Sequence, residues 1–357
     1  MKKELLLVGS VPFETPEEVF RTCSEEIGKY VPALPDGEFG DRTLWIIMLA
    51  YRVFHGHPEI ETIKRPPYAN GAENWKPANR SEAWHFRVKK GVEEVRFGDP
   101  GWRLNYAEPA IHSYFVFKTL RKEGVIPADV RFQVSLPITN SAIDFFFQDP
   151  ADYPRLKPGY TAALQAEVAK ILEKIPASDL ALQWDCCVEL MDLEGDIPWT
   201  PKENVLERHL AQIPELSAHL PKEMMLGYHL CYGTLGGWPM ATGQDLNHAV
   251  AFANGAVERS GRRVDFIHIP ILPTTEERYF APLRDLKVGD ADIYLGTLHD
   301  RGDKEALTRR IAVALKYVPE FGLAAPCGFG RHQPSEVRGL LKEHVEALEI
   351  LHKLKKG

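Results

Sequence analysis

The sequence predicts an α/β protein, a (β/α)8 TIM barrel with a long insertion after the second strand. Two observations lead to this prediction. Short, nearly continuous apolar runs recur along the chain, and segments with helical spacing of apolar residues separate them. This alternation is typical of a parallel sheet that is buried on both faces. Eight strand-then-helix units in 357 residues favour a closed barrel over the alternative, an open doubly wound sheet.

The eight expected strands are short segments rich in aliphatic and aromatic residues. Apolar runs of this length fit strands, because helices usually need ten or more residues. The segments are 4–10, 33–42, 130–137, 179–185, 223–233, 264–272, 291–300 and 321–328.

The clearest expected helix spans 303–318, where apolar residues recur at steps of three and four. Asp300 or Asp303 is available as its N-cap, and Pro319 ends the pattern. Similar spacing predicts helices at 15–30, 43–54, 107–123, 158–174, 201–219, 243–259 and 335–354.

A single barrel domain is expected to occupy residues 1–357, with one long insertion at 57–106. The insertion carries seven aromatic residues among Pro, Asn and Gly. Loops of this length inside a compact domain tend to be lids or binding elements. We interpret it as an aromatic-lined lid over the barrel mouth. The alternative is a packing role or a contact between the two subunits of a homodimer.

The composition excludes several classes of function. With 44% hydrophobic and 26% charged residues, the chain can bury a large core. A formal net charge of −7 opposes nucleic-acid binding, which needs clustered Lys and Arg. No segment reaches eighteen apolar residues, so no membrane span is expected. Five cysteines are an odd number and do not suggest a secreted disulfide framework, so we expect a cytoplasmic protein.

Polar residues end most of the expected strands, and in a barrel of this kind the active site lies at those ends. The first strand ends in Ser10, the second in Glu38, the third in Thr139 and the fourth in Asp185. The two carboxylates are the stronger candidates for a functional role. Turn formation or helix capping is the alternative role for each of these side chains.

A histidine and two cysteines form a candidate metal site. His229 and Cys231 are two residues apart on the fifth expected strand, so their side chains point to the same side. Cys327 ends the eighth strand, where a closed barrel can bring it across the mouth. One imidazole and two thiolates suit zinc, with the fourth position left for substrate. The alternative is a set of buried, inert thiols.

A zinc ion held in this way would keep a substrate thiol as the thiolate, or else would activate a bound water. The sulfur-rich ligand set favours the thiolate role. His299 ends the seventh strand near the same mouth, where it could act as the general acid that protonates a leaving group. Its alternative role is that of an ordinary loop histidine.

Seven fragments in order along nearly the whole chain resemble motifs of the catalytic barrel of the cobalamin-independent methionine synthase family. This family belongs to the methionine synthase and uroporphyrinogen decarboxylase-like superfamily. The resemblance implies zinc-dependent alkyl transfer to or from a thiol, with His229, Cys231 and Cys327 as ligands and a methyltetrahydrofolate as donor. The fragments are "VGSVPF", "PDGEFGDR", "SLPITNS", "LQWDCC", "HLCYG", "LGTLHD" and "APCGFGR".

The resemblance also implies roles for the polar strand ends. Ser10 would contact a substrate carboxylate, Glu38 and Asp185 would hold an amino group, and His299 would be the acid. Thr139 lies in the turn that matches the third motif, and we include it among the substrate-binding residues.

The sequence departs from the family pattern in four respects. The family's acidic pair after the fourth strand has become Asp185 and Cys186, and Cys187 stands where the family has a proline. Pro270 stands where the family has its fourth zinc ligand, a glutamate, so His268 or a water would have to replace that ligand. The chain is too short for the family's N-terminal folate-binding half. The stretch "GTLGGWPMATG" has no counterpart, and we expect its Trp238 to shape a different substrate pocket.

The sequence therefore predicts a zinc-dependent methyl- or alkyltransferase that acts on a thiol, with a folate, aromatic or other small-molecule donor. Two alternatives use the same barrel. One is a lyase or hydrolase, with or without zinc, and the other is a non-catalytic protein that binds a small molecule.

Overall fold

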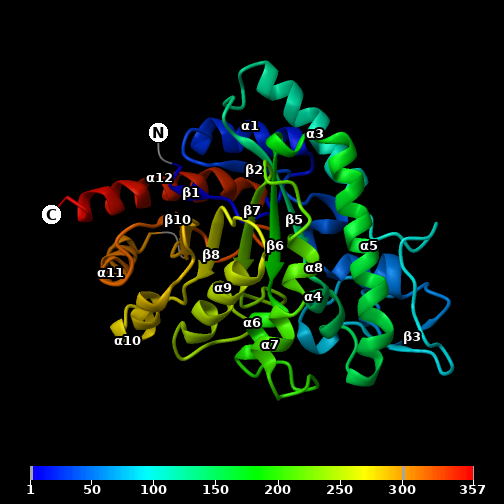
Figure 1. The fold of residues 1–357 in the computed structure, drawn as a ribbon. Coiled ribbons are helices and arrows are strands. Elements are labelled where there is room, and N and C mark those ends of the chain that lie inside the picture. The colour runs from blue at the N-terminus through cyan, green and yellow to red at the C-terminus, as the bar shows by residue number, and fades with distance from the viewer. Residues whose placement is uncertain (1–2, 300–301, 357) are drawn as a thin grey trace.

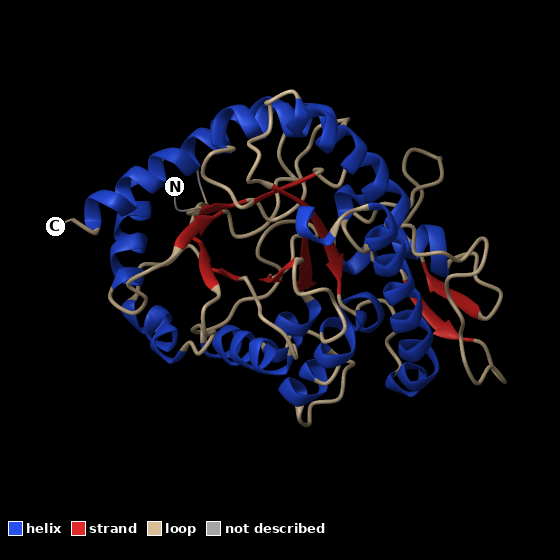
Figure 2. Ribbon diagram, turned by 45° about the horizontal axis from the view of Figure 1, so that its top comes forward, coloured by secondary structure: helices blue, strands red, loops and turns tan. Residues whose placement is uncertain are grey.

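Eight parallel strands form one nearly closed sheet surrounded by helices, which confirms the predicted (β/α)8 barrel (Figure 1). The computed structural model describes residues 3–299 and 302–356. The strand order is β1-β10-β9-β8-β7-β6-β5-β2, and Figure 2 shows the helices around these strands. The strands are β1 (Leu5–Leu6), β2 (Ala33–Pro35), β5 (Arg131–Pro137), β6 (Leu180–Cys186), β7 (Met225–Leu230), β8 (Phe266–Pro270), β9 (Asp292–Gly296) and β10 (Gly322–Ala324).

The barrel closes where the chain segments that follow β1 and β2 meet. Ser10 forms a parallel bridge with Gly37, and the Val11 amide donates to the Gly37 carbonyl at 2.9 Å. Gly37 has a φ of +83°, and a Cβ at this position would lie 2.6 Å from Val19 Cγ2. A side chain here would therefore suffer both backbone strain and a collision, so closure depends on glycine.

The helices lie outside the barrel, and most begin close to the predicted residues. Thr15 and Glu18 cap α1 reciprocally. Asp303 caps α11 by accepting a hydrogen bond from the Ala306 amide at 2.8 Å, whereas Asp300 lies outside the described residues. The helices are α1 (Pro16–Ile27), α2 (Ile47–Leu49), α3 (Ala107–Lys122), α4 (Thr139–Asp144), α5 (Tyr153–Lys174), α6 (Val188–Leu193), α7 (Val205–Leu210), α8 (Ile213–Ser217), α9 (Asn247–Arg259), α10 (Glu277–Phe280), α11 (Lys304–Leu315) and α12 (Val337–Leu354).

Two of the expected helices are interrupted. The segment 201–219 is split into α7 and α8, because Pro214 lacks an amide hydrogen and occupies the first turn of a new helix. The segment 43–54 contains the end of a 3-10 turn, the short α2 and a wider π turn. Trp45, which ends the 3-10 turn, has φ 54° and ψ −121°, a conformation outside the α region.

Residues 57–106 form a layer of their own beside the barrel (Figure 1). Within this segment β3 (Ile60–Lys64) and β4 (His85–Val88) pair in antiparallel fashion. Phe86 is buried and packs edge-on against Phe54 and Phe146, so part of the aromatic content serves packing. The described residues that line the cavity at the barrel mouth come from other segments. The lid role of 57–106 stays a prediction.

Buried side chains connect the two ends of the described chain in one hydrophobic cluster that runs from Leu5 in β1 to Leu351 in α12. Every residue of β6 is buried, as expected for a parallel strand covered on both faces. Within the ranges that the structure describes, we find no helix both long and apolar enough to cross a membrane.

We expect Gly37→Ala to lower the free energy of unfolding by at least about 3 kcal/mol, because the new methyl group adds a collision to the backbone strain. Gly40→Ala is the matched control, since Gly40 also has a positive φ, +68°, but a Cβ there would meet nothing within 4 Å. The control should lose only about 1 kcal/mol. Urea unfolding of both variants measures the difference. Equal losses of unfolding free energy would show that Gly37 is not crowded where the barrel closes.

Candidate functional site

The carboxyl ends of the barrel strands surround a cavity of about 60 Å³. Strand pairing produces this arrangement. Register places Asp185 on β6 opposite His229 on β7, so the polar ends of neighbouring strands meet at one level. Six of the residues that the sequence predicted as functional line the cavity: Ser10, Glu38, Asp185, His229, Cys231 and Cys327.

The imidazole and the two thiols that the sequence singled out lie together. One ligand atom from each of His229, Cys231 and Cys327 lies within 4.8 Å of the other two, and the two Sγ atoms are 3.5 Å apart. Thiolates bound to one tetrahedral zinc ion lie roughly 3.8 Å apart, so the spacing fits that ion. Without a cation, neighbouring thiols and burial raise the pKa of both cysteines well above the usual range. This donor set could hold zinc by three protein ligands.

His268 orients the histidine of this set. Its Nε2 lies 3.0 Å from the Ala325 carbonyl, which can only accept, so Nε2 carries the hydrogen. Burial lowers the pKa of His268 to about 4, and burial and His268 lower the pKa of His229 further, so both rings are neutral. His268 Nδ1 must then accept from His229 Nδ1 at 2.8 Å. The lone pair of His229 Nε2 is left for a metal, and His268, with both nitrogens engaged, does not replace the missing glutamate ligand.

Two acidic side chains share the cavity. Burial raises the pKa of Glu38 to about 8, with Arg42 opposing and Asp36 adding to the shift. Burial and the nearby Glu38 raise the pKa of Asp185 well above its usual range, although Gln183 donates to Asp185 at 2.8 Å. Near neutral pH such a pair retains protons, and a cationic group such as an amine would draw it into the charged state.

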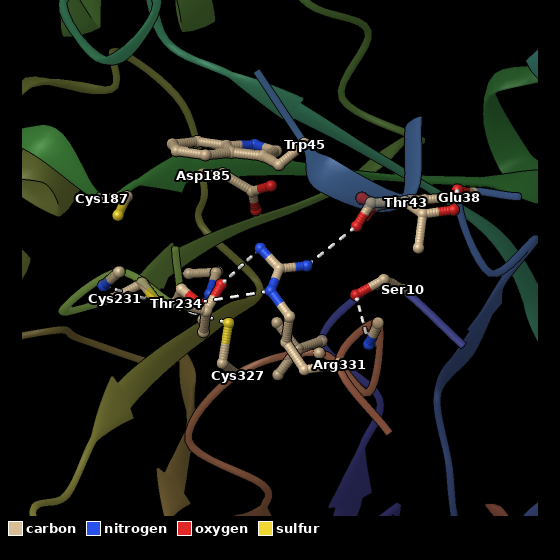
Figure 3. A pocket seen from close by; sticks show the side chains of 16 residues that line it. Ser10, Glu38, Thr43, Trp45, Asp185, Cys187, Cys231, Thr234, Cys327 and Arg331 are labelled. Carbon is tan, nitrogen blue, oxygen red and sulfur yellow. Dashed lines mark hydrogen bonds between the residues drawn. The ribbon is translucent and has the colours of Figure 1, made fainter. Parts of the chain in front are cut away.

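Backbone strain is concentrated around the same cavity. Glu38 has a φ of 52° and Trp45 a φ of 54°. The other non-glycine residues with positive φ in the described chain are Asn70, Asn105 and Asn204, and asparagine tolerates this region. Strained backbone that is held by its surroundings is typical of functional sites. Here it turns a carboxylate and an indole toward one space (Figure 3).

The loop after β10 is fixed against Ser10. The Phe329 amide donates to the Ser10 carbonyl at 2.7 Å, and the Gly330 amide donates to Ser10 Oγ at 3.2 Å. A Cβ on Gly328 would lie 2.3 Å from Ser10 Oγ, so the close approach requires glycine. This loop carries Cys327 at its start and Arg331 at its end.

Arg331 is a cavity residue that the sequence analysis missed. Figure 3 shows its guanidinium in the middle of the cavity, with hydrogen bonds to Thr43 and Thr234. The motif "APCGFGR" contained a signal, because an arginine four residues after a cysteine at a strand end has to lie near the mouth.

Three of the predicted residues lie elsewhere. Thr139 is buried and its Oγ lies 2.7 Å from Thr161 Oγ, so its side chain is directed at α5. His299 and Trp238 line a neighbouring cavity of about 350 Å³ and their rings lie 5.0 Å apart. Burial and Arg310 lower the pKa of His299 to about 3, so the free imidazole is neutral and carries no proton to give as an imidazolium.

Comparison with known proteins adds a fold relationship. No family model matches the sequence, and no curated protein matches it. Among solved structures, the fold is similar to that of a B12-independent methionine synthase from Shewanella sp. W3-18-1 in complex with selenomethionine. The identity is 14%, the TM-score is 0.61 and the likeness covers 98% of each chain. At this identity the likeness establishes a shared barrel fold.

We expect His268→Leu to weaken zinc binding about 10- to 100-fold, because it removes the acceptor that sets the tautomer of His229. His268→Asn should retain more affinity, since its amide oxygen can accept in place of Nδ1. Competition with a chromophoric chelator measures both constants. Equal affinity in the leucine variant and in the exposed control His219→Gln would contradict the assignment.

Glu38 predicts a pH dependence of stability. Its folded pKa of about 8 exceeds the ordinary glutamate pKa of 4.5, so the folded state binds more protons and this residue makes stability fall as pH rises across that interval. Glu38→Gln removes the proton release and should become progressively more stable than wild type between about pH 5 and pH 8. Urea unfolding at both pH values tests this. The exposed control Glu173→Gln should give a constant difference.

Proposed function

We propose that this protein is a zinc-dependent alkyltransferase that moves a methyl or larger alkyl group to or from a small thiol. The observation that carries the proposal is the convergence of His229, Cys231 and Cys327 at the open end of the barrel. The shared fold with a methionine synthase supports it. Pro270 occupies the end of β8 in place of a metal-binding glutamate, so methionine synthesis itself is outside the proposal.

The three ligands would leave one position of a tetrahedral zinc ion for the substrate. Zinc bound there would lower the pKa of a thiol in that position and hold it as the thiolate. Glu38 and Asp185 face the same cavity and would bind an amino group. Their raised pKa values favour this role, because a cation compensates the charge that burial disfavours.

The neighbouring cavity of about 350 Å³ would hold the alkyl donor. It shares Cys327 with the cavity of about 60 Å³, here called the metal cavity, and it offers the Trp238 indole to a planar molecule. In the transfer, the acceptor sulfur bonds to the alkyl carbon while the bond from that carbon to the donor breaks. The donor fragment leaves with the electron pair and takes up a proton. For His299 to supply that proton, the negative charge on the leaving fragment must first raise its pKa.

A hydrolase or lyase is the second candidate, and Pro270 is the observation that favours it. With no carboxylate ligand at the end of β8, a water could remain the fourth ligand of the zinc ion even when a thiol is present. The residues of the cavity would then assist a reaction of that water.

We expect about one zinc ion per chain in the purified protein, and much less in Cys231→Ser, because loss of one of three ligands removes much of the binding free energy. Metal analysis by mass spectrometry measures the content. Addition of 3-mercaptopropan-1-ol should add one sulfur to the zinc coordination seen by X-ray absorption, since the thiol enters the fourth position.

Cys23→Ala is the matched control, because Cys23 is a buried thiol in α1 that lines neither cavity. It should keep its zinc. A wild-type protein without zinc would refute the proposal. Zinc that keeps an oxygen ligand at saturating thiol would favour the hydrolase or lyase.

A further inference from the structure

Arg331 is a cation without an acidic partner. It is the only Lys or Arg among the described residues that line the metal cavity, and no carboxylate of the described chain lies within ion-pair distance of it. Its three hydrogen bonds go to neutral acceptors and are long. They join it to the Thr234 carbonyl at 3.3 Å, Thr234 Oγ1 at 3.3 Å and the Thr43 carbonyl at 3.4 Å. A guanidinium has five N–H donors, so capacity is left for a ligand.

Arg42 provides a contrast close by. It binds Asp36 through two nitrogens, at 2.7 and 3.3 Å, and Asp36 also accepts from Ser113 at 2.7 Å. The charge of Arg42 is therefore used inside the protein. Arg331 lacks such a pairing although the same cavity contains Glu38, and its side chain reaches the cavity centre instead (Figure 3).

The loop that carries Arg331 is fixed before any ligand arrives. Gly328 and Gly330 hold the loop against Ser10, and a Cβ on Gly330 would lie 3.0 Å from the Thr43 carbonyl. Ser10 Oγ accepts from the Gly330 amide and keeps one O–H to donate, whereas the guanidinium adds a positive charge and paired donors that match an acid group. The guanidinium is therefore the group best placed to recognise an anion in this cavity.

We propose that Arg331 binds an acid group of the substrate thiol, so that the acceptor is a short thiol carrying a carboxylate, sulfonate or phosphate. This inference rests on the proposed thiol chemistry at Cys327 and its two partners. Arg331 and Cys327 lie four residues apart on one loop, and both line the cavity of about 60 Å³ and the neighbouring cavity of about 350 Å³. A thiol that fits the smaller cavity has only a few bonds between its sulfur and its acid group.

Calorimetric titration of the zinc-loaded protein tests the inference with three thiols in which the same number of bonds separates the thiol sulfur from the terminal oxygen. They are 3-mercaptopropionate, 2-mercaptoethanesulfonate and the neutral 3-mercaptopropan-1-ol. We expect at least one acid thiol to bind about tenfold or more tightly than the alcohol, because it gains a charge-assisted pair. The stronger of the two acids identifies the acid class.

Arg331→Met should abolish that preference and leave the binding of the alcohol within about twofold. Arg331→Lys should keep part of the preference, because lysine retains the charge but not the paired donors. The exposed control Arg309→Met should change nothing. Equal binding of all three thiols to wild type would overturn the inference. Equal weakening of all three in Arg331→Met would do the same, since it would assign Arg331 a purely structural role between Thr43 and Thr234.

Butanoate, which has an acid group but no sulfur, separates this inference from the proposed function. It should bind the zinc-free protein weakly and lose at least about tenfold in affinity in Arg331→Met. If zinc or thiol coordination failed while butanoate still depended on Arg331, the proposed function would fall and anion binding by Arg331 would stand. If thiols bound to zinc and butanoate ignored Arg331, only this inference would fall.

Discussion

The hydrogen bonds of Ser10 are the contacts on which the rest of the site depends. Ser10 pairs with Gly37 after the second strand and accepts from Phe329 and Gly330 after the last one. One residue thus joins three strand ends. The thiol of Cys327, the carboxyl of Glu38 and the guanidinium of Arg331 all lie within a few residues of these contacts. Their mutual geometry follows from barrel closure, since the loops have little freedom of their own.

Burial gives the cavity a common electrostatic character. It raises the pKa of the carboxyl and thiol groups and lowers that of the His229 and His268 rings, so most of the lining is neutral when nothing is bound. Neutral, desolvated acids and thiols gain most from a cation, because the cation restores the charged form that burial suppresses. Arg331, the only Lys or Arg among the described residues that line the cavity, gains instead from an anion. The cavity therefore offers favourable contacts to both cationic and anionic ligand groups.

The fold could be predicted because its determinants are local. Apolar runs marked the strands, the spacing at His229 and Cys231 marked a shared side, and parallel order placed Cys327 nearby. The misses depend on the tertiary structure. The positive φ at Trp45 has no local signal in the sequence, the direction of Thr139 depends on a partner on α5, and the distinct role of His268 depends on the Ala325 carbonyl. Arg331 was missed because only the folded loop shows that no carboxylate of the described residues pairs with it.

The contact between Gly330 and Ser10 joins residues 320 positions apart in the sequence. During synthesis the N-terminal strands leave the ribosome long before the last strand exists, so this contact cannot form until nearly the whole chain is available. Contacts of such long sequence separation also form slowly. The cluster of His229, Cys231 and Cys327 is thus completed last. An incomplete chain presents His229 and Cys231 without Cys327, so completion of this cluster reports on completion of the fold.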